Sequence, residues 1–143
     1  IDPASLEEAR KKGWAVVKRP SGGGKVEHGN DLCFSAFWTK DNPSLPWKVK
    51  DSYLALHEWI RKCLLDLGVP SSLTQQKTDA DNGWCFQSAV CYDLIASGSK
   101  IAGGAQWREK ETALHQGSIQ LDLTSDTLPV FKKNFEEFFH AVF

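Results

Sequence analysis

Apolar side chains recur along this chain at two different spacings, which separate predicted helices from predicted strands. Steps of three and four residues connect the apolar positions Tyr53, Leu56, Ile60, Cys63, Leu64 and Leu67. Such steps place side chains on one face of a helix, and the following Gly68 and Pro70 mark its end. The same reasoning, with capping residues near the start of the chain, predicts helices over Asp2–Lys12, Lys50–Leu67 and Leu128–Val142.

Shorter apolar stretches predict strands. Apolar side chains in Leu32–Trp38 occupy both alternate sets of positions, as is typical of a strand buried on both faces. Turn residues separate the stretches after Cys85, which favours a series of hairpins. The predicted strands are Trp14–Lys18, Lys25–His28, Leu32–Trp38, Tyr92–Ala96, Lys100–Gln106 and Ala113–Leu123, with a polar loop over Gln75–Gly83.

The order of these elements predicts an α+β fold, in which helices pack on a mixed, mainly antiparallel sheet. A length of 143 residues suits one domain. We therefore predict a single domain over residues 1–143. Because the chain contains no methionine, we expect that Ile1 is not a native start and that strands completing the sheet precede it.

Charge and cysteine usage exclude several classes of protein. The 17 Lys and Arg residues nearly balance the 18 Asp and Glu residues, which argues against a general nucleic-acid surface. No apolar run reaches the ~20 residues that span a bilayer, and no signal peptide is evident. The four cysteines form no Cys-x-x-Cys pair and the histidines are scattered, so we expect no metal site and a reducing, cytoplasmic location.

A glycine-rich segment is the first candidate for a binding site. It runs from Arg19 to Lys25 and contains Gly22, Gly23 and Gly24 in succession. Three glycines exceed what a single turn needs, and their bare N–H groups can face an anion. A flexible hairpin with solvated basic side chains is an equally good interpretation. The segment also lacks the glycine spacing of a phosphate-binding P-loop.

Two further segments carry candidate chemistry. Lys100 precedes a run of small residues that ends at Ala105, and a lysine beside such a channel can contact a phosphate or a developing oxyanion. Considered alone, a surface lysine at a strand edge is the simpler interpretation, and such a lysine contributes little to stability. His115 lies in a predicted strand, where a histidine is more often structural than catalytic.

The order of three motifs resembles the lipoate-protein ligase and octanoyltransferase family. Lys18 to His28 (K-R-P-S-G-G-G-K-V-E-H) resembles the family signature. Tyr92-Asp93-Leu94, followed by Lys100 to Gln106, resembles its catalytic-lysine segment, and His115 to Ile119 resembles its His-Gly segment. The resemblance runs from the first predicted helix to about Leu123. Biotin-protein ligases share this fold, but their glycine- and arginine-rich loop is absent here.

This resemblance implies an enzyme that acylates a lysine of a lipoyl domain, in a 2-oxoacid dehydrogenase E2 subunit or a glycine cleavage H protein. In the ligases, lipoate and ATP with Mg²⁺ form lipoyl-adenylate, which the acceptor lysine attacks. Carried over by motif, Lys100 would hold the phosphate and carbonyl oxygens. The adenylate pocket would be lined by Arg19, Ser21, Gly22, Gly23, Gly24, His28, Asp93, Gly103, Gly104, Ala105 and His115.

Two alternatives differ in the acyl donor or in the activity itself. An octanoyltransferase of the same family moves octanoate from acyl carrier protein through a cysteine thioester and uses no ATP. The Cys85-Phe86 segment and the spacing from His28 to Leu32 resemble one branch of these transferases. A lapsed lipoate-binding module or half of a split ligase is the second alternative. Because Lys100 and the glycine-rich segment suit a phosphate, the ATP-dependent ligase is the main prediction.

Overall fold

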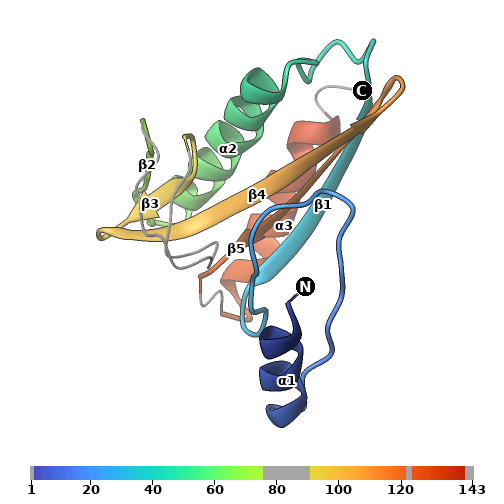
Figure 1. The fold of residues 1–143 in the computed structure, drawn as a ribbon. Helices are drawn as coiled ribbons and strands as arrows, with labels where there is room; N and C mark the ends of the chain where they lie inside the picture. Colours follow the sequence, from blue (N-terminus) through green and yellow to red (C-terminus); the bar gives the residue numbers. More distant parts are fainter. Residues whose placement is uncertain (1, 76–90, 122–123, 141–143) are drawn as a thin grey trace.

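The computed structural model of the chain describes residues 2–75, 91–121 and 124–140. Within these ranges, eight elements follow one another, and five of them are strands of one sheet (Figure 1). In chain order they are α1 (Pro3–Lys11), β1 (Leu32–Thr39), α2 (Val49–Asp66), β2 (Ser72–Leu73), β3 (Leu94–Ala96), β4 (Ser99–Glu109), β5 (Thr112–Ile119) and α3 (Thr127–His140).

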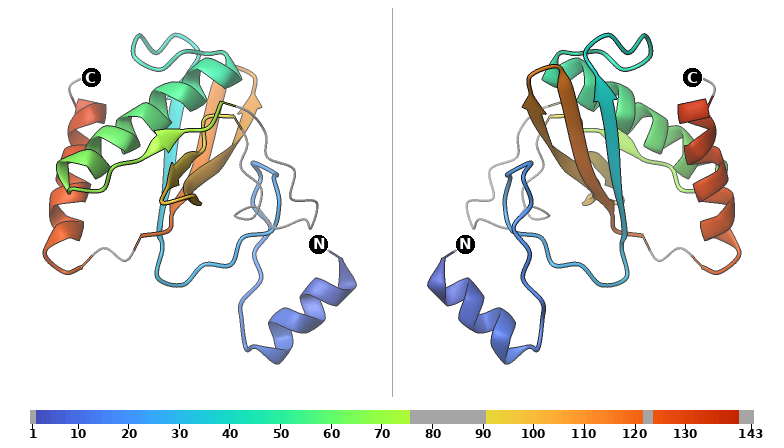
Figure 2. Two further views of the ribbon diagram at one scale, coloured as in Figure 1. Left: turned by 90° about the vertical axis from the view of Figure 1, so that its left-hand side faces the viewer. Right: turned by 90° about the vertical axis from the view of Figure 1, so that its right-hand side faces the viewer.

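The sheet has the strand order β1-β5-β4-β3-β2, and each pairing of these five strands is antiparallel. The predicted α+β class is therefore confirmed. Helices α2 and α3 cover one face of the sheet, while α1 and the segment that joins it to β1 lie on the opposite side (Figure 2). We call these the inner and the outer face.

The core lies between the inner face and the two covering helices. Ile60 and Leu64 of α2 are fully buried, and they pack in one cluster with Phe131 of α3 and Ile119 of β5. The apolar stripes that predict α2 and α3 thus become the surfaces that hold the helices on the sheet. Helix α1 contributes no buried residue, and Asp2 caps it by accepting a hydrogen bond from the Ser5 N–H at 2.9 Å.

The three predicted helices and four of the predicted strands are confirmed with shifts of their ends, while the predicted ends at Leu123 and Val142 lie outside the described residues. Two strand predictions are wrong. Trp14–Lys18 and Lys25–His28 form no strand apart from an isolated bridge at Lys25. Trp14 and Val17 are 45% and 85% exposed, so this stretch has no buried face to favour pairing. The short β2 was not predicted, and the predicted loop Gln75–Gly83 lies, after Gln75, outside the described residues.

Within the described parts of the chain, no helix combines the length and the apolar character needed to cross a membrane.

Candidate functional site

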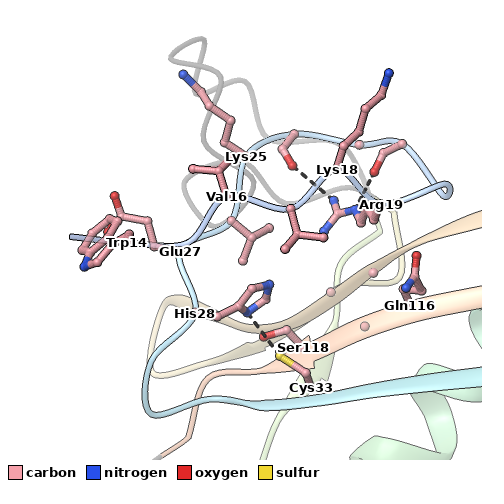
Figure 3. Close-up of a pocket in the computed structure, with 18 of the residues that line it drawn as sticks. Trp14, Val16, Lys18, Arg19, Lys25, Glu27, His28, Cys33, Gln116 and Ser118 are labelled. Carbon is pink, nitrogen blue, oxygen red and sulfur yellow. Dashed lines mark hydrogen bonds between the residues drawn. The ribbon is translucent and has the colours of Figure 1, made fainter. Parts of the chain in front are cut away.

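A cavity of about 740 Å³ lies between the outer face of the sheet and the segment that joins α1 to β1 (Figure 3). Its size is within the range usual for small-molecule sites. The segment from Trp14 to His28 forms one wall, and β1, β4 and β5 form the other.

The glycine-rich segment is held in shape by its own arginine. Arg19 Nε donates to the Gly22 carbonyl at 2.6 Å, and Nη2 donates to the Gly24 carbonyl at 3.2 Å (Figure 3). Gly22 and Gly23 have φ angles of +70° and +86°, which favour glycine. A Cβ atom at Gly23 would also lie 2.7 Å from Arg19 Nη2. Arg19 therefore stabilises the conformation of the loop that borders the cavity by bonding to two of its carbonyl groups.

A side-chain hydrogen bond attaches this segment to the sheet. Ser21 is buried, and its hydroxyl donates to Gln116 Oε1 on β5 at 2.9 Å. Gln116 itself lines the cavity. Ala105, which pairs with Gln116 across the two strands, lies close to Gly23. The outer face of β4 and β5 thus supports the loop directly.

Lys100 and Asp93 form a buried ion pair beside the cavity. Lys100 Nζ lies 2.7 Å from Asp93 Oδ2, and the two side chains are 6% and 0% exposed. The Tyr53 hydroxyl donates to the other oxygen of Asp93, and the Gly104 N–H donates to that hydroxyl at 2.9 Å. Two elements, α2 and β4, therefore fix the carboxylate that orients Lys100, which itself lines the cavity.

The absence of a side chain at Gly103, three residues after Lys100, has a structural reason. A Cβ atom at Gly103 would lie 2.5 Å from Lys100 Cε and 3.0 Å from Asp93 Oδ1. The lysine side chain thus crosses the space that a larger residue would fill. A glycine at this position leaves that space to the lysine side chain and its ion pair.

His115 lies on the inner face, away from the cavity. It is fully buried, stacks on Phe34 with ring centroids 5.5 Å apart, and has its Nδ1 3.1 Å from Gln106 Nε2. Burial, together with the charge of Arg108, lowers the pKa of His115 to about 3. A Cβ atom at Gly104 would lie only 2.4 Å from its Nε2. The structure does not bring this histidine to the site where sequence reasoning expected it.

His28 lies at the cavity wall, close to Cys33 on β1 (Figure 3). Its Nδ1 is 2.6 Å from Asp31 Oδ2 and 3.2 Å from Cys33 Sγ. Burial opposes ionisation of Asp31, but hydrogen bonds from Ser118, His28 and the Gly29 N–H outweigh it and lower the pKa of Asp31 to about 2. The carboxylate is therefore charged at neutral pH.

The structure brings most of the predicted site residues together. Those that line the cavity are Arg19, Gly22, Gly23, Gly24, His28, Lys100, Gly103 and Gly104. Asp93 and Ser21 hold lining residues in place, as described above. Cys85 lies outside the described residues. Sequence reasoning missed Gln116 and Ser118, although both alternate with His115 along β5 and so had to face the opposite side.

The chain matches the family model described as the lipoyl protein ligase A/B catalytic domain over residues 3–140. It is 32% identical to Octanoyltransferase LipM of Halalkalibacterium halodurans over 132 residues and 34% identical to that of Lysinibacillus sphaericus over 142 residues. These matches cover 87% and 93% of this chain, and 48% and 51% of the two relatives. The chain thus spans about half the length of the curated relatives it matches.

Solved structures share the fold at lower identity. The T. acidophilum protein Ta0514, solved with bound lipoic acid, superposes with a TM-score of 0.72 at 19% identity and covers 94% of this chain and 62% of that one. Lipoate-protein ligase A bound with ATP superposes with a TM-score of 0.69 at 19% identity, covering 94% and 63%. At these identities the likeness shows the fold alone.

Proposed function

Since the chain belongs to the lipoyl protein ligase A/B catalytic domain family, we propose that it transfers an octanoyl group from acyl carrier protein to a lysine of a lipoyl domain. The relatives named octanoyltransferase support this donor. They favour it over the ATP-dependent ligase that was the main prediction from the motifs. The acceptor would be an E2 subunit or a glycine cleavage H protein, as the family implies.

The observation that carries this proposal is the fixed ammonium group of Lys100 at the cavity wall. Acyl transfer places negative charge on the carbonyl oxygen, and a donor that is already oriented stabilises that charge without reorganising. The Asp93 carboxylate forms an ion pair with this ammonium group, with Lys100 Nζ 2.7 Å from Asp93 Oδ2. Because Lys100 also lines the cavity, its ammonium group is the cation that a developing oxyanion there would meet.

The nucleophile in this proposal is the Cys85 thiolate. Its sulfur would attack the thioester carbonyl of the carrier-bound octanoate, and the carrier thiol would leave and take up a proton. The amine of the lipoyl-domain lysine would then attack the enzyme thioester, lose a proton and form an amide, returning Cys85 to its thiolate. A cation close to the sulfur would favour the thiolate. A reducing compartment such as the cytoplasm belongs to this proposal because Cys85 must remain a free thiol.

A comparison of two donors tests the proposal. The purified protein is incubated with an apo lipoyl domain and either octanoyl-acyl carrier protein or lipoate with ATP and Mg²⁺. We expect intact-mass analysis to show one octanoyl group on the lipoyl domain in the first mixture and no modification in the second. Modification only with lipoate and ATP would restore the ligase as the better explanation. Modification in neither mixture would favour a module without transferase activity.

A further inference from the structure

Three side chains that can ligate a metal ion converge at the edge of the cavity. They are His28, Asp31 and Cys33, which all come from the six residues that lead into and begin β1. The distances between their donor atoms are 2.6 Å from His28 Nδ1 to Asp31 Oδ2, 3.2 Å from His28 Nδ1 to Cys33 Sγ and 3.5 Å from Cys33 Sγ to Asp31 Oδ2. A neutral imidazole, a carboxylate and a thiolate form a usual ligand set for zinc.

The arrangement of these atoms does not suit a proton relay. In a cysteine–histidine–carboxylate triad, the nucleophile and the carboxylate lie on opposite nitrogens of the imidazole ring. Here both Cys33 and Asp31 lie on the Nδ1 side of His28. One nitrogen cannot accept a proton from the thiol while it donates another to the carboxylate. Three donor atoms within 4.8 Å of one another can instead meet around one cation.

The distances fit such a site after small side-chain movements. At normal zinc–ligand lengths, tetrahedral coordination separates neighbouring donor atoms by roughly 3.3–3.6 Å. The Cys33–Asp31 separation of 3.5 Å already fits this range, and the other two are shorter. Each short pair has to move apart by less than roughly 1 Å. His28 is exposed and can make this movement without disturbing the core.

Hydrogen bonds from neighbouring groups orient the Asp31 carboxylate, as is usual for carboxylates that bind metal ions. Its side chain is 5% exposed, and Oδ2 accepts a hydrogen bond from the Ser118 hydroxyl on the neighbouring β5. The Gly29 N–H donates to its other oxygen at 2.9 Å. Such contacts orient a ligand and keep it ionised. In contrast, burial and the charge of Asp31 raise the pKa of the Cys33 thiol, so cation binding would release the thiol proton.

We propose that His28, Asp31 and Cys33 form a binding site for a thiophilic divalent cation such as Zn²⁺. Three protein ligands leave a fourth coordination position, as in zinc sites that remain open. His28 and Cys33 line the cavity, so this position is accessible from it. A bound cation would add positive charge at the wall that faces the glycine-rich segment. This inference does not depend on the proposed acyl transfer, because metal binding is measured directly.

Cobalt(II) titration of the whole protein tests the site. Thiolate ligation gives Co²⁺ a sulfur-to-metal charge-transfer absorption, and four-coordination intensifies its visible bands. We expect one equivalent of Co²⁺ to produce both signals and Zn²⁺ to remove them by competition. Cys33→Ser should abolish the charge-transfer absorption, whereas Cys91→Ser, at a partly exposed cysteine, should retain it. Charge-transfer absorption that survives in Cys33→Ser would overturn the proposal, as would its absence from the parent protein.

The affinity of the protein for Zn²⁺ tests His28 as a ligand and the hydrogen bond from Ser118 to Asp31. Competition with a chromophoric chelator gives the Zn²⁺ dissociation constant. We expect His28→Gln to weaken binding at least tenfold and Ser118→Ala to weaken it by roughly tenfold, as loss of an outer contact does. Unchanged affinity in His28→Gln would exclude this histidine as a ligand and overturn the site. Far-UV circular dichroism with thermal unfolding confirms that each variant is folded.

An alkylation experiment needs no variant and controls for folding. The protein is treated with iodoacetamide with and without Zn²⁺, and each cysteine is quantified by peptide mapping. Zn²⁺ should slow the alkylation of Cys33 at least tenfold and leave that of Cys91 unchanged in the same sample. Equal rates at Cys33 with and without Zn²⁺ would contradict the proposal.

Discussion

Removing Lys100 should destabilise the protein as well as inactivate it. Sequence reasoning treats this residue as a strand-edge lysine of little importance to stability, but its partner Asp93 is 0% exposed. Breaking a buried pair by removing one partner costs about 3–5 kcal/mol, because it leaves an uncompensated charge. Stability of a domain is ~5–15 kcal/mol in total. Lys100→Met should therefore lower the unfolding temperature by roughly 10 °C.

A double variant separates this effect from catalysis. Asp93→Asn removes the buried charge and can still accept a hydrogen bond from Tyr53, so it should restore much of the stability lost in Lys100→Met. Urea denaturation of the parent, both single variants and the double variant measures the coupling. Octanoyl transfer should stay at least a hundredfold below that of the parent in Lys100→Met and in the double variant, because both lack the donor to the oxyanion. Equal stability of Lys100→Met and the parent would refute the buried-pair argument, and near-normal transfer would refute the role of Lys100.

Three further predictions follow from particular contacts. The buried His115 has a pKa of about 3 against an ordinary 6.5, so the unfolded chain binds a proton there that the folded chain does not. As pH drops below 6.5, this histidine should lower stability by roughly 1.4 kcal/mol per pH unit, in addition to the effect of the buried His57, whose pKa is also lowered. His115→Gln should reduce the slope by the share of His115 in urea titrations. Gly103→Ala should displace Lys100 and reduce transfer tenfold or more, whereas Gly29→Ala, with open space around it, should leave the measured rate unchanged. Phe131→Ala should lower the free energy of unfolding by about 3–5 kcal/mol in the same titrations; a loss below 1 kcal/mol would contradict its place in the core.

The sequence predicts the helices well because their information is local. An apolar stripe such as Leu56, Ile60 and Leu64 has one arrangement that buries it. The Trp14–Lys18 error has the opposite cause, since an apolar stretch does not reveal whether a partner strand is available. In this structure the stretch stays unpaired and forms a cavity wall instead.

In the candidate site, too, features set by local pattern could be predicted, and contacts set by tertiary packing could not. The face of His115 could be predicted, because it shares its alternate positions along β5 with the apolar Ala113 and Ile119, which are buried. The contact of Asp93 with Tyr53, forty positions apart, could not be predicted because it depends on how α2 packs across the sheet. The proposed cation site lies outside the sequence prediction for a third reason. Sequence reasoning searched for groups of cysteine and histidine only, and the carboxylate of Asp31 completes this one.

Trapping the acyl-enzyme tests the central claim most directly. The protein is incubated with octanoyl-acyl carrier protein without a lipoyl domain and analysed by intact mass and peptide mapping. We expect one octanoyl group, released by hydroxylamine and located on Cys85, in the parent and in Cys91→Ser, but none in Cys85→Ser. Octanoyl transfer to a lipoyl domain by Cys85→Ser at the rate of the parent, or a thioester on a different cysteine, would contradict the proposed mechanism.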